Sequence, residues 1–249
     1  MDLYPQLEPN YTADCLAVWH KNVDFLKEDR FVEAYRRGMD SGHRIAREAG
    51  SKKDIHIEWR VHVICWAASH AAKLPGDFVE CGVNTGIFSL AAAYYVDFNR
   101  LQKSFYLFDT FAGIPEEQIT EEERAWGRHL DNAANYDECF EVAKQNFSIY
   151  PRAQLVRGRV PETLTTVEIP RVCYLSLDMN IAAPEIAALE FFWDKLTPGA
   201  PVILDDYGWA PYKTQKDVMD QFAARHGVHI LTLPTGQGLL LKPPGPAAA

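Results

Sequence analysis

Hydrophobic and polar residues alternate along this chain with two different periods. Over residues 12 to about 49, apolar side chains recur at helical spacing with charged ones between them, which predicts two helices ahead of the main domain. A third helical run covers 58–74, and Pro75-Gly76 ends it. Beyond that point short apolar runs alternate with longer amphipathic ones, so the fold changes character there.

The short apolar runs predict strands, and the amphipathic runs predict helices. Strands are expected at 77–83, 104–111, 153–160, 172–179, 200–207, 228–234 and 238–243, and helices at 86–98, 135–149, about 161–166, 184–196 and 214–226. Alternating strands and helices indicate a parallel sheet covered on both faces. Only 235–237 separate the last two strands, too few residues for a crossover, so those strands form an antiparallel hairpin.

The predicted fold class is therefore α/β. It is a Rossmann-like three-layer sandwich with a mostly parallel seven-stranded sheet, an antiparallel C-terminal hairpin and additional N-terminal helices. We expect a helical extension over 1–74, a main domain over 75–243, and a flexible Pro-rich tail over 244–249. A chain of 249 residues with 47% hydrophobic content can bury a core of this size.

Charge and cysteine content narrow the class of protein. The formal net charge of −9 argues against a nucleic-acid partner, because phosphate binding needs an excess of Lys and Arg on one face. Five cysteines, an odd number without a CxxC pair, suit a reducing cytoplasm. We see no signal peptide and no apolar run that could span a membrane, and so expect a cytoplasmic protein.

The segment "DFVECGVNTGIFSLAAAYY" (77–95) resembles a nucleotide-binding strand, turn and helix. Glu80 ends the strand, Gly82 and Gly86 flank the turn, and Thr85 is placed to cap the helix. Asp109 ends the second strand, where a carboxylate commonly meets ribose hydroxyls. Two alternatives stay open: the glycines serve only the turn, or Asp109 is only a helix cap.

Three aspartates converge on the neighbouring part of the predicted sheet edge. Asp178 ends the fourth strand, and Asp205 and Asp206 end the fifth. Carboxylates this close repel one another unless protons or a cation neutralise them, and oxygen ligands favour Mg²⁺, or Mn²⁺ or Ca²⁺ in its place, over Zn²⁺. The alternative is that Asp205-Asp206 caps a turn while Asp178 faces solvent.

Two further segments are candidates for the mouth of the site. The polar stretch 114–138 is long for a connection and is typical of a lid, although a solvated acidic face also explains its glutamates. It carries His129. Tyr207, Trp209 and Tyr212 follow the aspartate pair and are expected to stack on a ring of the substrate, with packing under the last helix as the alternative.

The segments "DFVECGVNTGIFSLAAAYY", "FYLFDTFAGIPE", "RGRVPETL" and "PGAPVILDDYG" together resemble the macrocin O-methyltransferase family, whose members are class I S-adenosylmethionine enzymes that methylate sugar hydroxyls. The resemblance runs from about residue 75 to residue 243. It implies an S-adenosylmethionine site and a Mg²⁺ ion held by Asp178, Asp205 and Asp206, which binds two vicinal hydroxyls of the acceptor. The implied cofactor-binding residues are Glu80, Gly82, Asn84, Thr85, Ser89, Asp109, Thr110, Phe111, Arg157, Gly158 and Asp178.

One position departs from the family pattern. Relatives commonly read Asp-x-Asp-Leu-Tyr after the fourth strand, with the second Asp as candidate general base, whereas this chain has Asn180. An amide is no useful proton acceptor. We therefore assign Asn180 to substrate contact and take Asp178, Asp206 and His129 as catalytic candidates, with Glu185 as a further possible base.

These observations predict an S-adenosylmethionine-dependent, Mg²⁺-assisted O-methyltransferase that acts on a sugar-containing natural product or polysaccharide precursor. One alternative is methylation of an amine, a carboxylate or a non-sugar hydroxyl without the metal. Another is an inactive nucleotide-binding or scaffold protein. The expected partner is a small-molecule acceptor, and family analogy implies a homodimer.

Overall fold

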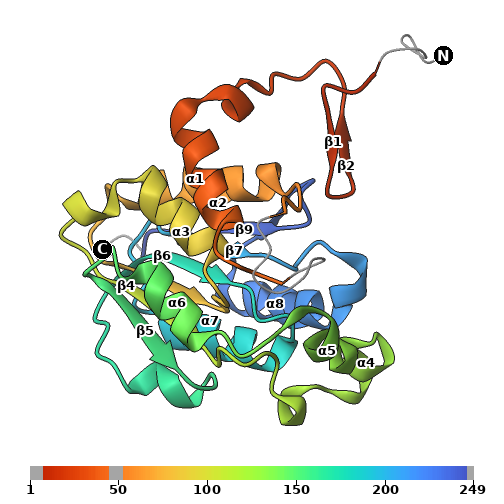
Figure 1. The fold of residues 1–249 in the computed structure, drawn as a ribbon. Helices are drawn as coiled ribbons and strands as arrows, with labels where there is room; N and C mark the ends of the chain where they lie inside the picture. The colour runs from red at the N-terminus through yellow and green to blue at the C-terminus, as the bar shows by residue number, and fades with distance from the viewer. Residues whose placement is uncertain (1–7, 45–52, 246–249) are drawn as a thin grey trace.

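A seven-stranded sheet organises the computed structural model, which describes residues 8–44 and 53–245 (Figure 1). The strand order is β5-β4-β3-β6-β7-β9-β8. The first five of these strands run parallel, and β9 is antiparallel to both β7 and β8, which confirms the predicted fold. The bounds are β3 Asp77–Cys81, β4 Phe105–Asp109, β5 Ala153–Arg157, β6 Val172–Leu177, β7 Pro201–Leu204, β8 Leu231–Thr232 and β9 Gly238–Leu241.

Helices cover both faces of this sheet (Figure 1). Successive residues of a strand point to opposite faces, so Phe78 joins one apolar cluster and Val79 joins the other. The first cluster also contains buried residues of α1 (Asp29–Met39), α2 (Glu58–Ala71), α3 (Ile87–Tyr95) and α6 (Phe140–Phe147). The second also contains buried residues of α7 (Ala182–Trp193), α8 (Lys213–His226) and the 3₁₀ turn η5 (Glu162–Thr165).

The N-terminal segment differs from its prediction. Residues Tyr11–Ala13 (β1) and Leu16–Val18 (β2) form a β-hairpin, and the 3₁₀ turn η1 (Asp24–Lys27) precedes α1. The prediction of two helices over 12–49 is therefore wrong in its first half, while 45–49 lie outside the described residues. Asp14 and Cys15 both have positive φ (49° and 58°), the geometry of a two-residue hairpin turn, which a helix does not allow.

Several strands and helices are shorter than predicted. The strand expected at 228–234 is reduced to two residues at the edge of the sheet, and the one expected at 153–160 ends before Gly158, whose φ is +139°. The helix expected at 135–149 begins only at Phe140. The division of the chain at residue 75 stays a prediction, although α1 and α2 share one apolar cluster with β3.

The segment 114–138 is folded into short helical turns. They are η3 (Glu116–Gln118), α4 (Glu121–Ala125), η4 (Arg128–Leu130) and α5 (Asp131–Asn135). Thr120 and Glu123 form a capping box at the start of α4. Buried Glu123 also accepts a 2.7 Å hydrogen bond from the backbone N–H of Ala182, so the segment is tied to the first turn of α7. Two further 3₁₀ turns are η2 (Phe98–Arg100) and η6 (Ala210–Tyr212). Among the described residues, no helix has the length and apolar character that a membrane span requires.

Candidate active site

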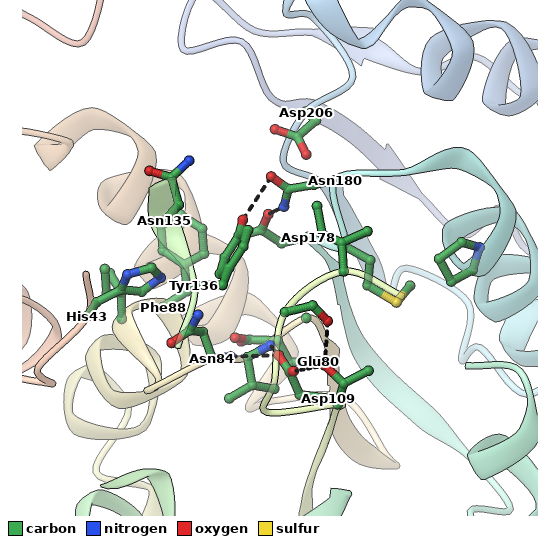
Figure 2. A pocket seen from close by; sticks show the side chains of 18 of the residues that line it. His43, Glu80, Asn84, Phe88, Asp109, Asn135, Tyr136, Asp178, Asn180 and Asp206 are labelled. Carbon is green, nitrogen blue, oxygen red and sulfur yellow. Dashed lines mark hydrogen bonds between the residues drawn. The ribbon is translucent and has the colours of Figure 1, made fainter. Parts of the chain in front are cut away.

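A cavity of about 420 Å³ lies at the carboxyl ends of the central strands. Figure 2 shows Asp206 at one end, Glu80 and Asp109 at the other, and Asp178 with Asn180 between them. Eleven of the residues predicted from the sequence line it, namely Glu80, Gly82, Asn84, Asp109, Thr110, Gly158, Asp178, Asn180, Asp206, Trp209 and Tyr212. The topology thus brings a candidate cofactor end and a candidate acceptor end into one space.

The loop after β3 is held tightly against its neighbours. A Cβ atom on Gly82 would lie 1.9 Å from the backbone oxygen of Asp178, and φ of Gly82 is +89°, so only glycine fits. Asp109 Oδ2 accepts hydrogen bonds from the backbone N–H groups of Val83 (2.6 Å) and Asn84 (2.7 Å). Asp109 therefore fixes the loop, and it is not merely a cap of the segment that follows it.

Glu80 is buried at the floor of the cavity. Its Oε1 accepts a 3.1 Å hydrogen bond from Ser89, whereas its Oε2 is buried without a partner among the described residues. Burial raises the pKa of Glu80 well above its usual value, and the charges of Asp178 and Asp109 add to that rise. A ligand with a hydrogen-bond donor or a positive charge would satisfy the unpartnered oxygen.

Asp178, Asp205 and Asp206 form the acceptor end. One carboxylate oxygen from each lies within 4.8 Å of the others. Burial raises the pKa of Asp178 to about 7, with the charge of Asp206 as the next cause, and burial raises the pKa of Asp206 to about 6. Arg60 pairs with Asp205, which is almost completely buried. An oxygen-only donor set of this kind fits a hard divalent cation.

Each of these carboxylates also receives one side-chain amide. Asn180 donates to Asp178 at 3.1 Å, Gln237 donates to Asp205 at 3.0 Å, and Gln215 donates to Asp206 at 3.4 Å. Gln215 is in turn held by buried Glu185 at 2.8 Å. Amide N–H groups stabilise the charged carboxylates and orient them, and of the three aspartates Asp178 and Asp206 line the cavity.

Asn180 also connects the acceptor end to the 114–138 segment. The hydroxyl of Tyr136 donates to Asn180 Oδ1 at 3.0 Å, drawn as a dashed line in Figure 2. Burial keeps the pKa of Tyr136 far above its usual value, so the hydroxyl remains a donor. Asn180 has φ of +64°, a conformation that asparagine tolerates better than most residues. The Asn180 amide therefore joins the Tyr136 hydroxyl to the Asp178 carboxylate through two hydrogen bonds.

Seven predicted residues do not line the cavity. Tyr207 is buried and donates to Asp220 at 2.6 Å, and Phe111 packs against Phe140. Ser89 reaches the site only through Glu80, and Asp205 only through its neighbours. Thr85 pairs with Ser41 at 2.9 Å and does not cap α3, and Arg157 pairs with Glu138. The last is His129, whose Nδ1 is buried and has no hydrogen-bond partner in the part of the chain that the structure describes.

Other lining residues come from segments that carry no motif. They include Asp14 from the N-terminal hairpin, His43 after α1, Phe88 in α3 and Tyr136 after α5. Arg60, at the start of α2, lies 145 positions from the aspartate that it contacts. No periodicity or spacing identifies Asp14, His43, Phe88 or Tyr136.

The family model described as macrocin-O-methyltransferase (TylF) matches residues 59–232. Mycinamicin III 3''-O-methyltransferase of Micromonospora griseorubida is 23% identical over 215 residues, which cover 82% of this chain and 80% of that protein. Demethyldecarbamoylnovobiocin O-methyltransferase of Streptomyces niveus is 26% identical over 163 residues, covering 63% and 61% respectively.

The fold agrees with a solved structure as well. The O-methyltransferase NovP superposes with a TM-score of 0.68 at 21% sequence identity, covering 85% of this chain and 88% of that one. The family match includes the loop after β3, Asp109 and the three clustered aspartates. This chain belongs to the macrocin O-methyltransferase family.

Proposed function

We propose that this methyltransferase transfers a methyl group from S-adenosylmethionine to a sugar hydroxyl of a glycoside natural product or polysaccharide precursor, with Mg²⁺ at the aspartate cluster. The relatives named above are O-methyltransferases of mycinamicin III and of demethyldecarbamoylnovobiocin. The observation that carries the proposal is the single cavity that joins Glu80 and Asp109 to the cluster of three carboxylates.

The donor end is suited to a nucleoside with a positively charged amino-acid tail. Asp109, beside the glycine-containing loop, is placed to bind the ribose hydroxyls, and Gly158 leaves space for the adenine edge. Glu80, with its unpartnered Oε2, is placed to accept from the methionine ammonium group or to offset the sulfonium charge.

The acceptor end is suited to a hydroxyl group that must lose a proton. Asp178, Asp205 and Asp206 would hold the cation, which supplies a Lewis acid that lowers the pKa of the acceptor hydroxyl. Asp178 and Asp206 line the cavity, and these carboxylates are the groups that could accept the proton of the acceptor hydroxyl. Asn180 keeps Asp178 oriented, and Trp209 and Tyr212 offer ring surfaces to the sugar. Catalysis would come mainly from this positioning and from electrostatic control of the acceptor oxygen.

Calorimetry tests the proposal in two steps. S-adenosylhomocysteine should bind to the protein, and Mg²⁺ should raise its melting temperature. Methyl transfer to a panel of glycosides should then require the metal and stop on addition of EDTA. Failure to bind either S-adenosylmethionine or S-adenosylhomocysteine would leave only a scaffold role, whereas transfer that survives EDTA would favour the metal-free alternative.

The assembly and the compartment belong to the same proposal. We expect a homodimer by analogy with the family, measurable as a mass of about twice 28.2 kDa in light scattering. All five cysteines are free, which suits the reducing cytoplasm. A monomer at micromolar concentration would contradict the first expectation.

A further inference from the structure

The N-terminal hairpin contributes one side chain to the cavity. Asp14 stands at its turn, lines the cavity, and interacts electrostatically with Arg60, the partner of Asp205. The hairpin is anchored by Tyr11, whose hydroxyl donates to Glu58 at 2.7 Å and whose ring meets Trp59 edge-on. The position of Asp14 is therefore set by a fixed element.

The Asp14 carboxylate has no partner of its own. It makes no hydrogen bond and no ion pair within residues 8–44 and 53–245, although the side chain is half-buried. Burial raises its pKa, and the charge of Arg60 only partly offsets that effect. Arg60 is already committed to Asp205, which it contacts through two of its nitrogens. The Asp14 carboxylate is therefore available to a ligand in the cavity.

Acidic side chains outnumber basic ones around the cavity. Its lining includes five acidic side chains, those of Asp14, Glu80, Asp109, Asp178 and Asp206, and the guanidinium of Arg60, while Arg128 also acts on Asp206. On the proposed function, a divalent cation and the two arginines balance the aspartate cluster, and the charged donor lies at the Glu80 and Asp109 end. Asp14 is then the carboxylate left without a counter-charge of its own, close to Arg60.

We propose that Asp14 is a specificity-determining residue that binds a protonated amine on the acceptor, so that the substrate is an amine-bearing glycoside. The inference rests on the proposed function and names its substrate class. An ammonium group donates charge-assisted hydrogen bonds to a carboxylate, and the ring of Trp209 in the same lining also favours a cation. The same acidic lining disfavours a nucleoside diphosphate sugar, whose two phosphates would meet these carboxylates.

The test measures the binding of matched glycosides by saturation-transfer NMR, with S-adenosylhomocysteine and Mg²⁺ present. Each pair in the panel consists of a methyl aminoglycoside and its neutral N-acetyl counterpart, and uridine diphosphate glucose is the anionic probe. The wild-type protein should bind the best amine about tenfold more tightly than its neutral partner, as expected for one partly buried ion pair.

The variant Asp14→Asn should lose this preference and bind both members of a pair equally. Asparagine accepts positive φ, so the hairpin turn is retained. Asp24→Asn is the matched control, because it removes the same charge from an exposed position of the same extension and should keep the preference.

Three results would overturn the inference: a panel in which no amine binds more tightly than its partner, an unchanged preference in Asp14→Asn, or tighter binding of the nucleotide sugar. Calorimetry of S-adenosylhomocysteine on each variant separates the two proposals. If the donor product binds normally while the amine preference is absent, only the role of Asp14 fails. If the donor product does not bind to the wild type, the proposed function fails with it.

Discussion

The two ends of the cavity use carboxylates in opposite ways. At the donor end, Asp109 is surrounded by backbone N–H groups from Val83, Asn84 and Phe111 at 2.6–2.7 Å, so its charge is stabilised before any ligand arrives. At the acceptor end, three carboxylates lie within reach of one another, and burial raises the pKa of Asp178 and of Asp206.

On the proposed function, this difference suits one sheet edge to two ligands. Asp109 is already hydrogen-bonded before a ligand binds, whereas the cluster of three aspartates holds excess negative charge that a cation would relieve. A substitution at one end of the cavity should therefore leave ligand binding at the other end nearly unchanged.

The largest effect is expected from Asp109→Ala. Removing this carboxylate releases the loop after β3 and the ribose contact together, so the affinity for S-adenosylhomocysteine should fall by about 100-fold or more, as for the loss of two charge-assisted hydrogen bonds. Titration calorimetry measures the loss. The stabilisation of the same variant by Mg²⁺ should persist, and its disappearance would show that the two ends are not separable.

The converse change is Asp206→Asn. It removes one cluster charge while it keeps the side-chain volume, and Mn²⁺ affinity measured by electron paramagnetic resonance should fall by about 30-fold, a typical cost of one charged oxygen ligand. The affinity for S-adenosylhomocysteine should stay within about threefold of wild type, since Asp206 lies at the opposite end of the cavity from Glu80 and Asp109 and distant sites couple weakly. Unchanged Mn²⁺ binding would remove Asp206 from the set of metal ligands.

Asn180→Asp introduces the residue that is common in relatives. It replaces an amide donor, 3.1 Å from Asp178, by a fourth carboxylate, and so should destabilise the metal-free protein by about 2 kcal/mol at pH 8. Urea unfolding with and without Mg²⁺ measures this, and the metal should recover most of the loss. Asn135→Asp is the matched control, because Asn135 lines the cavity without a hydrogen bond to any of the three aspartates in the described structure. Equal destabilisation by both substitutions would deny the special role of Asn180.

The smallest effect concerns pH and Glu185. Burial raises the pKa of Glu185 to about 8 from its ordinary 4.5, so the folded state prefers the protonated form. Its contribution to stability is present below pH 4.5 and is lost as pH rises toward 8, because the unfolded chain ionises first. Glu185→Gln should therefore be more stable than wild type at pH 8, by on the order of 1 kcal/mol, and gain little at pH 5. A gain that is the same at both pH values would contradict the shift.

Much of the fold follows from local patterns. Pro75-Gly76 marks the start of the sheet, and the period-2 and period-3.6 runs predict the order of strands and helices. The short connection between the last two strands forces their antiparallel pairing. The hairpin at the N-terminus escaped prediction because its apolar residues also match a helical repeat, and only the turn at Asp14 and Cys15 decides between the two.

The sequence by itself determined the strand-end residues of the site. Glu80, Asp109, Asp178 and Asp206 were identified because side chains at the carboxyl ends of parallel strands must share one edge. The tertiary structure alone decided what surrounds them: the amides of Gln215 and Gln237, the guanidinium of Arg60, the hydroxyl of Tyr136 and the carboxylate of Asp14. These groups come from elements brought together by packing. Arg60 and Asp205 lie 145 positions apart, so no local pattern shows that they pair. The charge of the acceptor end, and with it the inferred amine, is therefore a property of the folded cavity.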